Sequence, residues 1–115
     1  MTTEQFYREI GSDYAAVLER LGAEDMIRRF VLKFPQDPSF SALEEGFAKR
    51  DAEVAFRAAH TLKGVAANLG LERLRALASD MTECLRRGEL SGAQARLAET
   101  ETAYRRVLAA LEELK

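Results

Sequence analysis

The chain has 115 residues, about the length of one domain, and 47% of them are hydrophobic, enough to build a core. Its 17 basic and 19 acidic residues give a formal net charge of -2, so no global basic field favours nucleic acid or an anionic membrane surface. No apolar run approaches the roughly 18 residues of a membrane span, and the N-terminus lacks a signal-peptide pattern. We expect a cytoplasmic protein in which residues 1–115 form one domain.

Cysteine, histidine and proline usage narrows the class further. The single cysteine, Cys84, excludes an internal disulfide, and one cysteine with one histidine cannot supply the ligands of a typical zinc site. Only two prolines occur, among abundant alanine, leucine, glutamate and arginine, and no segment alternates in the manner of a strand. The sequence therefore predicts an all-α protein.

Apolar residues recur at the 3.6-residue helical period along six segments. In chain order, the segments are about 12–21, 24–34, 37–49, 52–69, 71–88 and 92–114. Asp37 and Asp51 are suitable N-caps, and Ser91 with Gln94 has the spacing of a capping box. Gly70 and Gly88 are suitable helix ends.

The connections between the last four segments contain only a few residues, which favours antiparallel neighbours. We therefore predict an antiparallel up-down four-helix bundle, with one or two short N-terminal helices packed on it. The stripe of Met26, Phe30 and Phe34 is expected to be core, and Cys84 is expected in or beside the interior.

The only histidine, His60, lies in the middle of the predicted helix 52–69. At about 100° per residue, the apolar stripe of this helix centres near Ala55, and His60 points about 140° away from it. The stripe comprises Ala55, Ala59, Leu62, Ala66 and Leu69, flanked by Ala58 and Val65. We therefore expect His60 to be exposed.

The residues around His60 indicate a docking face. Gly64 costs about 1 kcal/mol relative to alanine in a helix interior, and on an exposed face it fills no core space. Close approach of a partner would explain this glycine, while Lys63 could reach an anion on the imidazole. Phe56 and Ala67 add apolar surface. A neutral imidazole can attack phosphorus, and phosphoryl transfer depends mainly on alignment and charge neutralisation, so this chemistry fits the face.

Residues 59–70, AHTLKGVAANLG, resemble the signature of histidine-containing phosphotransfer (HPt) domains. The likeness rests on the His-x-Leu-Lys-Gly core, the alanine two residues after the glycine, and the Leu-Gly that ends the helix. It continues along the following leucine-rich helix to about Gly88. The resemblance implies a four-helix bundle in which His60 accepts a phosphoryl group from a receiver-domain aspartyl phosphate and passes it to another receiver.

The resemblance also implies roles for neighbouring residues. Lys63 would steady the phosphoryl oxygens, and Gly64 would give the receiver clearance. The residues expected to contact the partner are Phe56, Arg57, Ala67 and Thr82. Many family members carry Gln or Glu at the position of Thr82, where it hydrogen-bonds the active-site region, and Thr82 is shorter.

The partners implied are receiver domains of response regulators, a hybrid histidine kinase, or both, bound by a monomer. No cofactor or metal is expected on this chain, because in this family the receiver's acidic pocket holds the Mg²⁺ needed for transfer. Neither nucleic acid nor a membrane is an expected partner.

Function classes other than phosphotransfer make different demands on the sequence. A non-catalytic helical adaptor could bind a receiver domain or a partner helix through Phe56, Gly64 and Ala67. A di-metal bundle would need Glu-x-x-His pairs on facing helices, which a chain with one histidine lacks. No phosphate loop of the Gly-x-x-x-x-Gly-Lys-Ser/Thr type occurs, so we expect a phosphocarrier without autonomous kinase activity.

Overall fold

The computed structural model describes residues 1–115, and its secondary structure is helical with no strand. The elements are α1 (Thr3–Glu9), α2 (Tyr14–Leu21), α3 (Glu24–Leu32), a 3₁₀ turn η1 (Phe34–Gln36), α4 (Ser39–Ala48), α5 (Ala52–Leu69), α6 (Glu72–Arg86), α7 (Leu90–Gln94) and α8 (Leu97–Leu114). The prediction of an all-α protein is confirmed.

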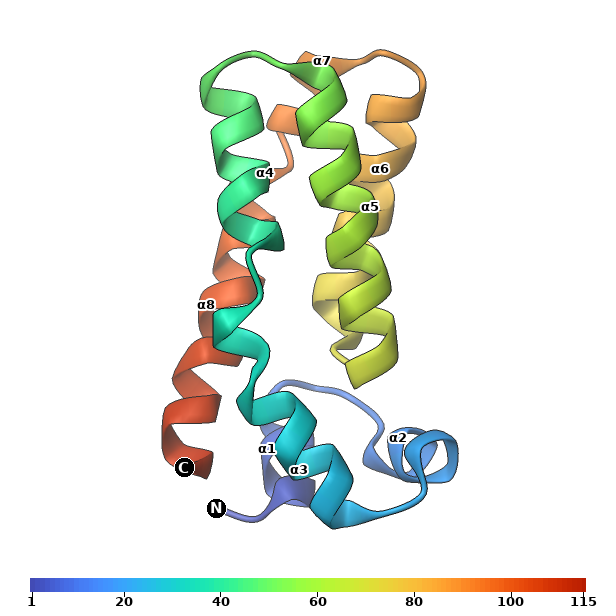
Figure 1. The fold of residues 1–115 in the computed structure, drawn as a ribbon, viewed down its shortest axis with the longest axis vertical. Coiled ribbons are helices and arrows are strands. Elements are labelled where there is room, and N and C mark those ends of the chain that lie inside the picture. Colours follow the sequence, from blue (N-terminus) through green and yellow to red (C-terminus); the bar gives the residue numbers. More distant parts are fainter.

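Four of these helices, α4, α5, α6 and α8, lie side by side, and each runs in the opposite direction to the one before it (Figure 1). Helices α1, α2 and α3 gather at the end where α5 finishes, and both chain termini lie at this end. The ring of Phe40 in α4 stacks on that of Tyr104 in α8, with centroids 4.2 Å apart. This contact joins the first helix of the four to the last.

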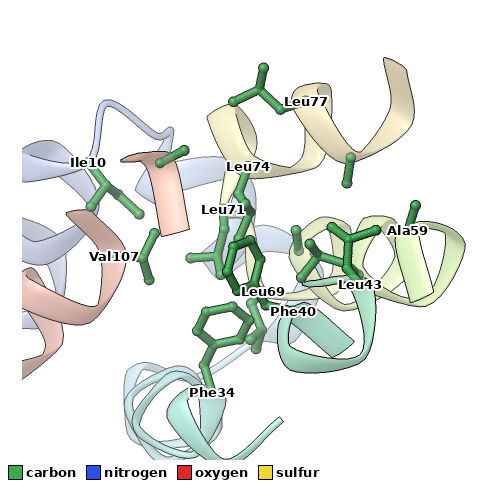
Figure 2. Packing of buried hydrophobic residues seen from close by; sticks show 14 of the residues in the cluster. Ile10, Phe34, Phe40, Leu43, Ala59, Leu69, Leu71, Leu74, Leu77 and Val107 are labelled. Carbon is green, nitrogen blue, oxygen red and sulfur yellow. The ribbon is translucent and has the colours of Figure 1, made fainter. Parts of the chain in front are cut away.

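One cluster of 29 buried hydrophobic residues forms the core. Figure 2 shows side chains from α4, α5, α6 and α8 directed toward one another, with Phe34 and Ile10 at the side of the N-terminal helices. Because burial of apolar surface is the main stabilising contribution in a bundle of this size, this cluster fixes how α5 is oriented. The solvent-facing side of α5 is thereby fixed as well.

Helix α5 begins and ends as its sequence predicts. The Asp51 carboxylate accepts a hydrogen bond from the amide of Val54 at 3.1 Å, which caps the N-terminus. Gly70 ends the helix in the left-handed region, with φ of +72°. The Tyr7 hydroxyl donates a 2.6 Å hydrogen bond to the Leu69 carbonyl, so α1 holds this end of α5.

The N-terminal segment contains three helices, whereas one or two were expected. Helix α1 starts with a capping box. The backbone N–H of Gln5 donates to Thr2 Oγ1, and the backbone N–H of Thr2 donates to Gln5 Oε1. The Thr-x-x-Gln spacing is a sequence signal for this helix start, and the buried Phe6 and Tyr7 supply its inner face. Helix α1 is not among the six predicted segments, the first of which begins at about residue 12.

The predicted helix 92–114 is wrong as one element, because the structure divides it into α7 and α8. The Arg96 amide donates to the Ala93 carbonyl, three residues back, so a tighter turn interrupts the α-helical ladder. The capping box predicted for Ser91 and Gln94 is absent, since α7 begins after Glu89 without a side-chain cap.

The core assignment of Met26 and Phe30 is also wrong. These side chains are 39% and 40% exposed, whereas Phe34 is buried as expected. Ile27 and Val31 form the buried face of α3 instead. A helix at the end of a bundle is covered on one side only, so its second apolar stripe stays in solvent.

Candidate functional site

His60 lies near the middle of α5 and faces solvent, as the angular argument predicts. The five residues of the predicted stripe are buried: Ala55, Ala59, Leu62, Ala66 and Leu69. No hydrogen bond in the structure involves the His60 imidazole. Neither ring nitrogen is therefore engaged by another group of the protein.

The ring of His60 lies beside that of Phe56, one helical turn earlier. The two planes differ by 12° and the centroids are 6.1 Å apart, which is an offset parallel arrangement. Phe56 is half-buried and packs against the core. It therefore presents an apolar edge next to the imidazole.

Lys63 provides a free positive charge close to His60. It lies three residues beyond the histidine on α5, is only partly covered, and forms no ion pair. The acidic neighbour across on α6 is Glu83, whose carboxyl pKa is lowered mainly by its hydrogen bond to Arg86 and the charge of Arg86, with a further contribution from Lys63. Since Glu83 is already bound to Arg86, the Lys63 ammonium remains available to an anion.

Gly64 leaves open space one turn after His60. A Cβ built on Gly64 meets no atom within 4 Å, so no packing inside this molecule requires a glycine there. By contrast, packing does require a glycine at position 46 in α4. A Cβ added to Gly46 would lie 2.7 Å from the backbone nitrogen of Ala55 in the neighbouring helix α5. The contrast supports the interpretation of Gly64 as clearance for a partner.

Two further predicted contact residues flank this face. The guanidinium of Arg57 is exposed and pairs with the Glu53 carboxylate on the same helix. Arg57 and Thr61 also line an open groove of about 310 Å³ between α4 and α5. Ala67 is half-buried near the end of α5, where its carbonyl accepts a 2.7 Å hydrogen bond from Arg20.

Thr82 does not belong to this exposed face. Its side chain is 0% exposed, and its hydroxyl donates a 2.7 Å hydrogen bond to the Ala78 carbonyl within α6. The expectation that Thr82 contacts a partner is therefore wrong, because its side chain is buried inside the bundle. Helix α6 packs against both α5 and α8 and so buries a wide stripe, in which Thr82 lies one turn after Ala78.

Arg86 is a residue near the site that sequence reasoning missed. Its guanidinium carbon lies 5.3 Å from the centre of the Phe56 ring, in a cation–π arrangement. Its Nε donates to Glu83 Oε2 at 3.0 Å. The spacing of Glu83 and Arg86 predicts their pairing, but the contact with Phe56 depends on how α5 and α6 pack.

The structure contains no group of three or more His, Cys, Asp or Glu residues that could hold a metal ion. None of its helices combines the length and the hydropathy that crossing a bilayer requires.

Comparison with known proteins gives one match. A family model described as "Hpt domain" matches residues 13–115 and so includes α2 through α8. No curated protein and no solved structure matches the chain.

Proposed function

Because this chain belongs to the Hpt domain family, whose members carry out histidine phosphotransfer in two-component systems, we propose that His60 is its phosphoryl acceptor and donor. Family members interact with receiver domains and histidine kinases. We propose receiver domains of response regulators, a hybrid histidine kinase, or both as the partners, in a relay located in the cytoplasm.

The transfer itself needs one nucleophilic atom on this chain. A ring nitrogen of neutral His60 attacks the phosphorus of a receiver's aspartyl phosphate; the N–P bond forms as the P–O bond to the aspartate breaks. The aspartate leaves as a carboxylate, and the phosphoimidazole can pass its phosphoryl group to a second receiver by the reverse exchange. The Mg²⁺ is supplied by the receiver.

The observation that carries the proposal is the placement of His60. An exposed imidazole with no hydrogen-bond partner lies one turn before a free ammonium at Lys63 and open space at Gly64 on the same helix. Lys63 stabilises the charge on the phosphoryl oxygens, and Gly64 lets the receiver approach. Because the chemistry consists of alignment and charge neutralisation, no further nucleophile or base is required on this chain.

The test is intact-mass analysis of the purified protein after mixing with Mg²⁺ and a panel of receiver domains phosphorylated with acetyl phosphate. We expect an acid-labile gain of one phosphoryl group, which is absent from the His60→Gln variant. A protein that binds receivers but gains no mass with any of them would contradict the proposal. That result would favour an adaptor that docks through the same face.

A further inference from the structure

One aromatic side chain lies beside the exposed imidazole of His60. No hydrogen bond restrains the ring, and the near-parallel ring of Phe56 is its only aromatic neighbour. Thr82 on α6 forms no hydrogen bond to the imidazole, since its hydroxyl donates to the Ala78 carbonyl. The contact with Phe56 is therefore the interaction available to hold the imidazole in one rotamer.

Phe56 is itself contacted from the neighbouring helix α6. The guanidinium of Arg86 lies 5.3 Å from the centre of its ring, and Glu83 binds the Arg86 Nε at 3.0 Å. Arginine forms planar contacts with aromatic rings and directed contacts with carboxylates at once, so it can link the two groups. The contacts run from Glu83 to Arg86 on α6, then to Phe56 and His60 on α5.

We infer that Phe56 is a positioning residue for phosphoryl transfer, and that the Glu83–Arg86 pair holds Phe56 in place. The inference rests on the proposed function and adds what sets the direction of the nucleophilic nitrogen. Attack on phosphorus requires the attacking and leaving groups to be roughly in line, so the ring must point at a docked receiver in one orientation.

The size of the effect follows from the rotamers of histidine. In a helix, χ1 has two common wells and the imidazole χ2 is broad and roughly two-fold, so a free ring would occupy a given orientation about a quarter of the time. Loss of the Phe56 ring is therefore expected to lower the rate of transfer within the docked complex by about fourfold.

The experiment measures single-turnover transfer from a receiver domain charged with acetyl phosphate, in Mg²⁺, using a receiver shown to phosphorylate the wild-type protein. Phe56→Leu keeps an apolar side chain without the ring, and Phe56→Tyr keeps the ring. We expect Phe56→Leu to lower the saturating rate about fourfold and Phe56→Tyr to retain it. An unchanged saturating rate in Phe56→Leu would overturn the inference. A variant that only needs a higher receiver concentration for half-saturation would overturn it too, because that change indicates weaker docking.

Two readouts separate positioning from other defects. Phosphoramidate labels exposed histidine directly, forming the N–P bond and releasing ammonia, and it needs no docked orientation; we expect Phe56→Leu to label as fast as wild type. His60 is the only histidine, so its imidazole NMR signals are unambiguous. The Hα–Hβ couplings should change from one rotamer toward an average in Phe56→Leu, and unchanged couplings would contradict the inference.

The contribution of Arg86 is tested by a double-mutant cycle. If Arg86 acts through Phe56, Arg86→Met slows saturated transfer in the wild-type background and has no further effect on Phe56→Leu. Independent, multiplying losses would refute the link. Absence of any transfer to the wild-type protein would refute the proposed function instead, so the two failures are distinguishable.

Discussion

The backbone of Gly46 in α4 lies against the backbone of Ala55 in α5, so closely that a Cβ on Gly46 would be 2.7 Å from the Ala55 nitrogen and 2.9 Å from its Cα. Both residues are buried, and backbone atoms on one helix cannot move aside as a flexible side chain can. The close approach holds α5, the helix that carries His60, against α4. Gly46 is therefore required by packing between helices, whereas Gly64 is not.

Gly46→Ala is expected to destabilise the protein. Alanine gains about 1 kcal/mol of helix propensity over glycine, but forcing the helices apart in a packed core typically costs more, about 1–3 kcal/mol before any further loss of packing. Urea unfolding monitored by circular dichroism measures the net change in the free energy of unfolding. A variant as stable as wild type would show that moving α4 costs no more than the roughly 1 kcal/mol of helix propensity that alanine gains.

Gly64→Ala is the matched control, because it adds the same methyl group inside a helix. Its Cβ meets nothing, so the free energy of unfolding is expected to rise by about 1 kcal/mol. The bulkier Gly64→Leu should keep the bundle folded yet weaken receiver docking and slow transfer. If Gly64→Leu transfers phosphate as well as wild type, the open space at Gly64 is not used by the partner.

His60→Gln should abolish phosphorylation while leaving the fold intact. His60 is exposed and makes no hydrogen bond, and surface substitutions away from special features usually change stability by less than about 0.5 kcal/mol. Thermal unfolding and intact-mass labelling on the same preparation check both halves of this prediction. A large fall in Tm would indicate that the imidazole has a structural role that its exposure conceals.

Tyr7→Phe should weaken the attachment of α1 to the end of α5. It removes the hydroxyl that donates to the Leu69 carbonyl, a buried hydrogen bond whose loss costs about 1 kcal/mol at neutral pH. Urea unfolding of wild type and Tyr7→Phe at pH 7 measures this difference.

The difference in unfolding free energy between wild type and Tyr7→Phe should shrink at alkaline pH. Burial raises the pKa of the Tyr7 phenol above its ordinary value, so the neutral phenol is favoured in the folded state. A phenol whose pKa is higher in the folded state than in the unfolded state stabilises the fold at pH values below the unfolded pKa of about 10. Wild type loses this stability as the pH rises above that value, whereas Tyr7→Phe has no phenol to titrate. A gap in unfolding free energy that stays constant up to about pH 11 would contradict this cause.

Several features of the candidate site could be predicted from sequence because they depend on one helix only. The direction of His60 follows from the 3.6-residue period, and the bounds of α5 follow from Asp51 and Gly70 at its ends. Lys63 and Gly64 keep their places relative to His60 in any helix that contains them. Because these relations are local to one helix, the predicted exposure of His60 is confirmed by the structure.

Features that involve two helices could not be predicted in this way. The wide buried stripe of α6 places Thr82 inside, and only the register of α5 against α6 brings Arg86 to the Phe56 ring. The exposure of Met26 depends on which elements lie over α3. Sequence periodicity gives the direction of a side chain from its own helix axis but not what lies in that direction.

The sequence by itself determined an all-α chain, the helix that carries the histidine, and the outward direction of that histidine, because hydrogen bonding along a helix and its caps are local. The tertiary structure alone decided which helices bury which faces, that α1 holds the end of α5 through Tyr7 and Leu69, and that His60 has Phe56 and Arg86 beside it without a hydrogen-bond partner. The physical reason is that burial and interhelical contacts depend on the relative placement of segments far apart in the chain, which the packing of the whole core sets.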